Sequence, residues 1–237
     1  SGRKPVIATK STSSSYEDME KAVHEAIEAM GVEYIDIFHL HAARVTPDVF
    51  EQRKGALQCL LDYKNKGVIK AVGISTHNVK TVETAALRED IDVVFPLINK
   101  IGRGILEGTA EDMEKAMELC RKNGKGIYIM KALGGGTMIS DYAASMEYAL
   151  ELPGKYSIAL GMVSMEEAIY NLKYFNGERD IEGLATMNNK YVKVVQSMCV
   201  SCGKCIEAGH SEAIGFDEKG KSRVDQSKCL QCGYCIA

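Results

Sequence analysis

Six cysteines near the carboxyl end of the chain are the residues whose types and spacing indicate chemistry most directly. They form two triplets that share one spacing, with two residues between successive cysteines. The first triplet is Cys199, Cys202 and Cys205, and the second is Cys229, Cys232 and Cys235. Three thiolates at this spacing can hold one face of an iron–sulfur cubane, whereas a zinc ribbon needs only paired cysteines. We therefore interpret the triplets as metal ligands for one or two 4Fe-4S clusters, with zinc or disulfides as the alternatives.

The segment that carries the triplets resembles a bacterial two-cluster ferredoxin domain. Residues 213–216 and 222–224 are expected to form a short hairpin between the triplets. In that family a fourth Cys, followed by Pro, serves the other cluster. Here Gly209 and His210 occupy those positions after the first triplet, and the matching position after the second falls beyond residue 237. We expect no four-cysteine site to close within these residues. His210 is a candidate replacement ligand, with a surface residue as the alternative.

The composition excludes several classes of function. Hydrophobic residues make up 46% of the 237 residues, so the chain can bury a sizeable core. No stretch approaches the roughly 18 apolar residues of a membrane helix. A net charge of -3 and a pI near 6.0 give no indication of a nucleic-acid partner. Because the cysteines are clustered, they indicate a reducing compartment, and we expect a cytoplasmic protein.

A second set of reactive side chains follows two apolar runs early in the chain. The run at residues 6–10 ends in Lys10, and the run at residues 35–41 contains His39 and ends in His41. An ammonium group can lower the pKa of a neighbouring acid, and an imidazole can orient a carbonyl. Lys10 and His41 are therefore candidate catalytic residues. We interpret His39 as an interior histidine, with a His-x-His metal pair of a barrel hydrolase as the alternative.

Six such apolar runs alternate with amphipathic segments. They lie at residues 6–10, 35–41, 69–75, 93–99, 127–131 and 157–161. They recur at intervals of roughly 24 to 34 residues, which is typical of parallel strands joined by crossover helices. The pattern predicts an α/β fold, namely six of the eight units of a (β/α)8 TIM barrel. A doubly wound sheet is the alternative, but no Gly-x-Gly-x-x-Gly motif follows any run.

Capping residues predict where the helices begin. Ser15 and Gly31 enclose the first helix, Thr46 begins the second, and Thr109 begins the third.

Three regions are expected along the chain. Residues 1–180 form the barrel-like domain, residues 181–197 a linker, and residues 198–237 a small α+β ferredoxin-like iron–sulfur domain. The chain starts directly in an apolar run and stops inside a cysteine motif. We therefore expect a fragment that lacks the first two βα units and the extreme carboxyl end.

The strand motifs resemble those of the aldo-keto reductases over most of the barrel-like region. The motifs similar to strands three, four, five, seven and eight of that family lie at residues 6–11, 34–41, 71–75, 126–136 and 159–172. The motif at residues 126–136, which is similar to strand seven, most resembles the branch of the family that carries a C-terminal iron–sulfur segment. The resemblance implies a catalytic set of Asp, Tyr, Lys and His, in which Lys10 and His41 supply the last two. The Asp and Tyr would lie upstream, so we expect this chain alone to be catalytically incompetent.

The resemblance further implies a nicotinamide cofactor, NADH or NADPH. Its candidate binding residues are Ser75, Asn99, Lys131, Gly161, Ser164 and Asn171. Two positions depart from the family pattern, since Thr76 stands where many members have Asn, and Lys100 replaces the Gln that usually follows Asn99. Ser164 and Glu167 are expected to cap a helix, whose amino terminus can receive a phosphate.

These features predict an NAD(P)H-linked oxidoreductase that acts on a small-molecule carbonyl or alcohol substrate. The iron–sulfur module would transfer electrons and implies a redox protein as a partner. Hydride carries two electrons whereas a cluster carries one, so a flavin (FMN) barrel with a ferredoxin tail is one alternative. A non-catalytic electron carrier or redox sensor on a degenerate barrel is another.

Overall fold

The structure is a computed structural model that describes residues 4–154, 156–162, 164–179, 191–209, 212–229 and 235. The chain divides into two compact units. Unit 1 comprises Ser1–Ile98, Ile105–Met130 and Leu152–Ser157, and unit 2 comprises Asn99–Gly104, Lys131–Glu151 and Ile158–Ala237. The predicted boundaries near residues 180 and 197 remain a prediction.

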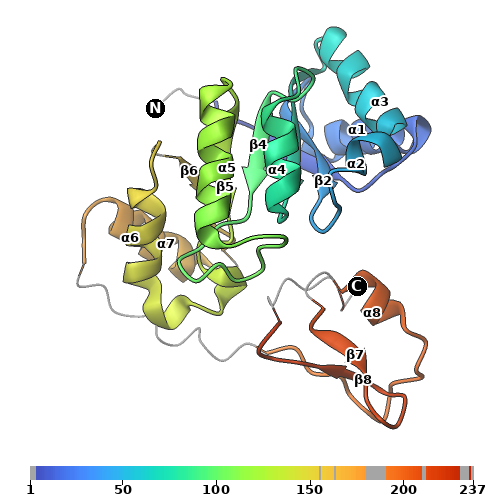
Figure 1. Ribbon diagram of the computed structural model, residues 1–237, viewed down its shortest axis with the longest axis vertical. Helices are drawn as coiled ribbons and strands as arrows, with labels where there is room; N and C mark the ends of the chain where they lie inside the picture. The colour runs from blue at the N-terminus through green and yellow to red at the C-terminus, as the bar shows by residue number, and fades with distance from the viewer. Residues whose placement is uncertain are drawn as a thin grey trace. The chain divides into compact units, whose positions relative to one another are not determined.

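Six strands form one sheet in sequence order (Figure 1). They are β1 (Ala8–Ser11), β2 (Ile35–Ala42), β3 (Ile69–Thr76), β4 (Val93–Pro96), β5 (Gly126–Met130) and β6 (Ser157–Ala159). The pairs from β1 to β5 are parallel. Each predicted apolar run therefore contains a strand, as the barrel prediction requires. Because right-handed crossovers join neighbouring parallel strands, the helices lie on one face of such a sheet and leave the other face for a site.

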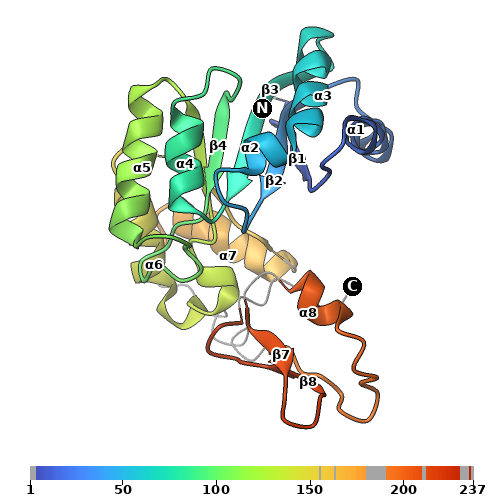
Figure 2. The same cartoon turned by 45° about the vertical axis from the view of Figure 1, so that its right-hand side comes forward.

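The crossover helices of unit 1 are α1 (Tyr16–Met30), α2 (Val49–Gln52), α3 (Lys54–Asn65), α4 (Val79–Ala86) and α5 (Ala110–Lys122). The Ser15 side chain caps α1 and left-handed Gly31 ends it, as predicted. Thr109 is the residue before α5, as predicted, and it forms a capping box with Asp112. Helices α4 and α5 lie side by side (Figures 1 and 2).

The predicted start of the second helix at Thr46 is wrong. Thr46 lies in a turn, where its carbonyl accepts a hydrogen bond from Val49 at 3.0 Å, and α2 begins only at Val49. The helical run is also divided at Arg53, whose φ of -118° and ψ of 30° leave the helical region. The Arg53 guanidinium donates a hydrogen bond to the main-chain carbonyl of His41 at 2.7 Å, so the residue at the break contacts the end of β2.

The core of unit 1 lies between the sheet and these helices. Alternate strand residues face the helices, and they include Phe38, Leu40, Val72, Ile74 and Val94. The helices cover them with apolar side chains that include Met19, Val23, Leu60, Val82, Met113 and Cys120. The sheet residues between these positions therefore project to the opposite face, where polar side chains gather.

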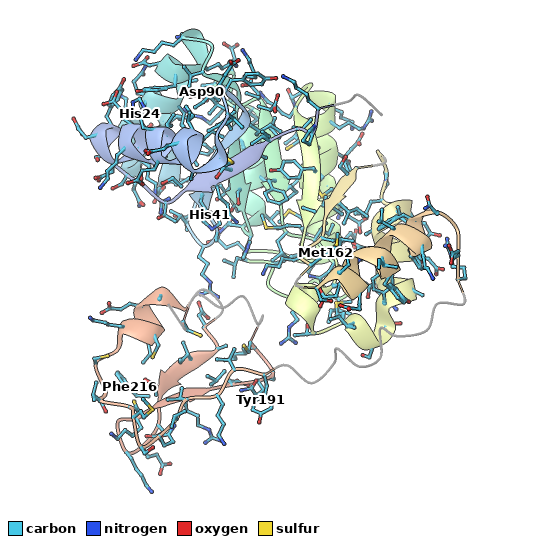
Figure 3. All side chains as sticks on the ribbon, turned by 180° about the vertical axis from the view of Figure 1, so that it is seen from behind. His24, His41, Asp90, Met162, Tyr191 and Phe216 are labelled. Atoms are coloured by element: carbon cyan, nitrogen blue, oxygen red, sulfur yellow. The ribbon has the colours of Figure 1, made fainter. Side chains whose placement is uncertain are left out.

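Unit 2 contains smaller elements. They are two 3-10 turns, η1 (Gly134–Gly136) and η2 (Ile139–Asp141), the helices α6 (Tyr142–Glu151), α7 (Met165–Phe175) and α8 (Lys204–Ala208), and the strands β7 (Ile214–Phe216) and β8 (Ser222–Val224). β7 and β8 pair in antiparallel register around left-handed Gly220, so the predicted hairpin is confirmed. Phe216 of this hairpin is labelled in Figure 3 and is 53% exposed.

Candidate active site

The carboxyl ends of β1, β2 and β3 bring together three of the predicted site residues. Lys10 pairs in register with His39, and His41 pairs with Ser75. The Nδ1 atom of His41 lies 3.0 Å from the Ser75 hydroxyl oxygen, and both residues are buried. Figure 3 labels His41 at the end of β2. Parallel βα folds place their active sites at this end of the strands.

His39 is an interior histidine, as the sequence predicts. Only 1% of its surface is exposed, and its Nε2 atom lies 2.6 Å from the Tyr128 hydroxyl oxygen of β5. Burial, followed by the charges of Lys10 and His41, lowers the pKa of His39 to about 3. The imidazole is therefore neutral near pH 7. Among the residues described in the structure, no group of three His, Cys, Asp or Glu side chains could hold a metal ion.

Tyr128 is a polar residue of this face that sequence reasoning missed. Its ring stacks on Phe95, with the ring centroids 3.9 Å apart, and burial raises the pKa of its phenol to about 12. Tyr128 therefore stays protonated. The alternation of strand residues could have indicated its direction, but only the register across the two intervening strands, β3 and β4, shows that it reaches His39.

Gly73 of β3 provides the space that the His39 ring occupies. A Cβ atom on Gly73 would lie 2.2 Å from His39 Nδ1 and 2.9 Å from the Val93 carbonyl oxygen. Any other residue at this position would therefore displace the imidazole. The glycine is required by side-chain packing across the sheet, which no local sequence pattern reveals.

The predicted cofactor residue Asn99 belongs to unit 2, and its side chain forms hydrogen bonds within its own loop. Its side-chain oxygen accepts a hydrogen bond from the Arg103 main-chain N–H at 2.8 Å, and its amide donates to the Arg103 carbonyl at 2.9 Å. Asn99 is fully buried. Both ends of the amide thus stabilise the loop, and a role in cofactor binding remains a prediction.

Four further cofactor candidates also lie in unit 2. Lys131 follows β5 with a left-handed φ of 62°, and the space beside Gly161 is open. The Ser164 side chain caps α7 by accepting a hydrogen bond from the Glu167 N–H at 3.3 Å, which confirms the predicted cap. Acidic Glu166 and Glu167 occupy the first turn of α7 and weaken its attraction for a phosphate.

Asn171 forms hydrogen bonds within unit 2 at both ends of its side chain. Its oxygen accepts from the Tyr142 hydroxyl at 2.6 Å, and its amide donates to the Glu167 carbonyl at 2.7 Å. These bonds join α6 to α7, so the structure gives Asn171 a packing role alongside the predicted one.

Two cysteines of the first triplet, Cys199 and Cys205, contact Ser222 of β8. The Ser222 N–H donates to the Cys199 sulfur at 3.4 Å, and the Cys205 thiol donates to the Ser222 hydroxyl oxygen at 3.3 Å. Hydrogen bonds from the main chains of Ser222 and Ser201 lower the pKa of Cys199. Cys202 is exposed on the surface.

In the second triplet Cys229 is buried and Cys235 is partly exposed, whereas Cys232, like His210, lies outside the described residues. No described group of three ligands converges as a metal site. The donor set nevertheless fits an iron–sulfur cluster chemically, because thiolates with N–H···S hydrogen bonds are its usual environment. The iron–sulfur assignment thus rests on the cysteine spacing.

The fold and the site together define a parallel βα-barrel protein with an ammonium and an imidazole at its strand ends. The family model for the aldo/keto reductase family matches residues 1–146. The chain therefore belongs to the aldo/keto reductase family.

Solved structures show the same fold. A protein from Pseudomonas aeruginosa that is described as an aldo-keto reductase superposes with a TM-score of 0.59 at 22% identity, covering 70% of this chain and 62% of that one. The holo form of an aldo-keto reductase from Bacillus halodurans gives 0.59 at 15% identity, covering 78% and 73%. Aldose reductase from Giardia lamblia gives 0.54 at 14% identity, covering 80% and 74%. The chain thus spans less than two thirds of the Pseudomonas protein.

No curated protein matches the chain. Among the described residues, no helix is both long and apolar enough to cross a membrane.

Proposed function

We propose that this chain is part of an NAD(P)H-linked oxidoreductase that acts on a small-molecule carbonyl or alcohol, with an iron–sulfur electron-transfer module. The observation that carries the first half is the His41–Ser75 pair beside Lys10 in a chain of the aldo/keto reductase family. A buried imidazole, a hydroxyl and an ammonium fit the donor set that a nicotinamide and a carbonyl need. When bound, the nicotinamide supplies the hydride.

The residues of this chain would act on the carbonyl oxygen. His41 would donate a hydrogen bond to that oxygen and so orient the carbonyl, while Ser75 fixes the imidazole through its 3.0 Å contact. Lys10 would favour the ionised form of a neighbouring acid. Arg53 holds the main chain of His41 in place through its carbonyl. The residues proposed to hold the nicotinamide cofactor are Ser75, Asn99, Lys131, Gly161, Ser164 and Asn171.

Titration of NADH and NADPH against the chain tests this half of the proposal. We expect the fluorescence of the reduced nicotinamide to change on binding, and binding to weaken in Ser75→Ala. Thr84→Ala is a matched control, because its hydroxyl bonds only the preceding helical turn, at the Lys80 carbonyl. The absence of any binding would favour the electron carrier. A yellow chromophore that remains after iron removal would favour the flavin alternative.

The second half of the proposal rests on the two cysteine triplets. They would bind one or two iron–sulfur clusters, which exchange single electrons with a redox protein. Ser222 supports it because it contacts the sulfurs of both Cys199 and Cys205. Anaerobic counts of iron and sulfide per chain test it. Colourless protein that retains zinc tightly would overturn this half and leave the nicotinamide half standing.

A further inference from the structure

Helix α7 exposes an apolar stripe. Met165, Ile169 and Leu172 recur at intervals of four and three residues, so they share one face of the helix. Their exposed fractions are 70%, 47% and 65%. Met162, which precedes α7 and is labelled in Figure 3, is exposed as well. A surface helix usually turns a polar face to water, so α7 has its apolar and polar faces reversed.

The opposite face of α7 packs within unit 2. Asn171 and Tyr174 are buried on that face. Tyr142 of α6 donates a hydrogen bond to the Asn171 side chain at 2.6 Å, and its ring meets the Tyr174 ring edge-on, with the centroids 5.0 Å apart. These contacts hold α7 with the apolar stripe turned outward. A contiguous exposed apolar patch of this kind marks an interaction surface.

Two opposite charges border the stripe on the same side. Glu166 lies in the first turn of α7 and Lys173 in the last turn. Glu166 is three residues before Ile169 and Lys173 is four residues after it, which places both beside the middle of the stripe. The two charges are about two helical turns apart. A second α7 helix that runs in the opposite direction therefore brings its Lys173 to Glu166 and its Glu166 to Lys173.

We propose that the apolar stripe of α7 is an interface between two copies of this chain, which pair their α7 helices antiparallel about a twofold axis. The contacts of such an interface are mutual, so one charge pair is formed twice. Pairing removes the apolar side chains from water, and the opposed helix dipoles attract one another. The charge pattern of a single helix is thus complementary to a second copy of itself. This interface does not depend on the proposed oxidoreductase function.

Sedimentation equilibrium of the 237-residue chain measures the dissociation constant of the dimer. Leu172→Glu should raise this constant about tenfold or more, because the interface would bury an unpaired carboxylate in each copy. Leu87→Glu is the matched control, since Leu87 is 69% exposed and belongs to unit 1. The control should leave the constant unchanged. Both positions are exposed, so both variants should fold, as thermal unfolding will show.

Charge reversal tests the antiparallel arrangement. Glu166→Lys and Lys173→Glu should each raise the dissociation constant several-fold when studied alone, because two like-charge contacts replace two opposite-charge contacts. An equimolar mixture of the two variants should recover the parent constant, since each charge then meets its opposite in the mixed dimer. Mixing changes nothing within either chain, so the recovery reports pairing and not the stability of α7.

Three outcomes would overturn the interface. The first is a parent chain that stays monomeric at every concentration. The second is a dimer whose dissociation constant is the same in Leu172→Glu and Leu87→Glu, and the third is a mixture of the charge variants that shows no recovery. If the chain dimerises but a form extended by upstream residues is monomeric, those residues cover the stripe and the interface between copies is likewise overturned.

Discussion

His39 and His41 show how two identical residues on one strand obtain different chemistry from their neighbours. The two lie on the same face of β2, two residues apart. His41 meets the Ser75 hydroxyl, whereas His39 meets the Tyr128 phenol and lies in register with Lys10. Because His39 is deeply buried and lies near Lys10 and His41, its imidazole stays neutral near pH 7.

The lowered pKa of His39 predicts how stability depends on pH. Unfolding returns this pKa from about 3 to about 6.5, so between these values the unfolded chain binds a proton that the folded chain does not. The contribution is complete above about pH 6.5 and is lost as the pH falls toward 3. Urea unfolding at pH 6, 5 and 4 should show the wild-type free energy of unfolding falling more steeply than that of His39→Gln, by up to about 1.4 kcal/mol per pH unit. Parallel curves would contradict the prediction.

Removal of the Tyr128 hydroxyl should destabilise the chain. Tyr128→Phe leaves His39 Nε2 buried without its 2.6 Å partner, which costs about 1–3 kcal/mol. Tyr34→Phe is the matched control, because the ring of Tyr34 packs under Lys70 and no hydrogen bond of its hydroxyl is seen among the described residues. Denaturant unfolding measures both. Equal stability of the two variants would show that the phenol–imidazole bond contributes nothing.

At the scale of elements, the alternation of apolar runs and capped helices was sufficient to predict all six strands of the sheet. Ser15, Thr109 and Ser164 cap their helices because capping depends on residues within one turn. The second helix was expected to begin at Thr46 but begins at Val49, and the helical run is divided at Arg53. The Arg53 guanidinium donates a hydrogen bond to the His41 carbonyl, a contact between two elements that no local sequence pattern reveals.

The residues of the candidate site were also predictable where their positions follow from local sequence patterns, and not where they depend on tertiary contacts. Lys10, His41 and Ser75 were found because strand ends can be read from the sequence. Tyr128 was not, since its contact with His39 depends on the register of strands far apart in the chain. Asn99 has an observed role in its loop, which the sequence did not reveal, and its role in cofactor binding stays a prediction.

The packing of β3 against β2 gives a test of the register. Gly73→Ala places a methyl group 2.2 Å from His39 Nδ1, so it should cost about 1–3 kcal/mol of unfolding free energy. In a His39→Ala background the same change should cost less, although the Val93 carbonyl at 2.9 Å keeps part of the penalty. A double-mutant cycle by denaturant unfolding measures this coupling. Additive costs would mean that His39 does not occupy the space beside Gly73.

At the scale of the whole molecule, the proposed function combines two kinds of redox chemistry in one chain. A hydride site moves two electrons, whereas an iron–sulfur cluster moves one, so neither half explains the other. The family match covers residues 1–146 and leaves the cysteine triplets outside it. The barrel and the cysteine segment therefore need separate tests of function.

For the barrel, the most direct of these tests is an assay of carbonyl reduction by the chain. The resemblance assigns Lys10 and His41 to the catalytic set, but no Asp–Tyr pair of these 237 residues matches its other two members. We expect the chain to bind NADPH or NADH yet to show no carbonyl-dependent oxidation of either, as measured by absorbance at saturating aldehyde. The reason is that transfer of hydride to a carbonyl also requires a proton donor, and the resemblance assigns no acid of these 237 residues to that role. Turnover that persists in wild type and disappears in Tyr128→Phe, but not in Tyr34→Phe, would contradict this expectation and assign the proton donor to the His39–Tyr128 pair.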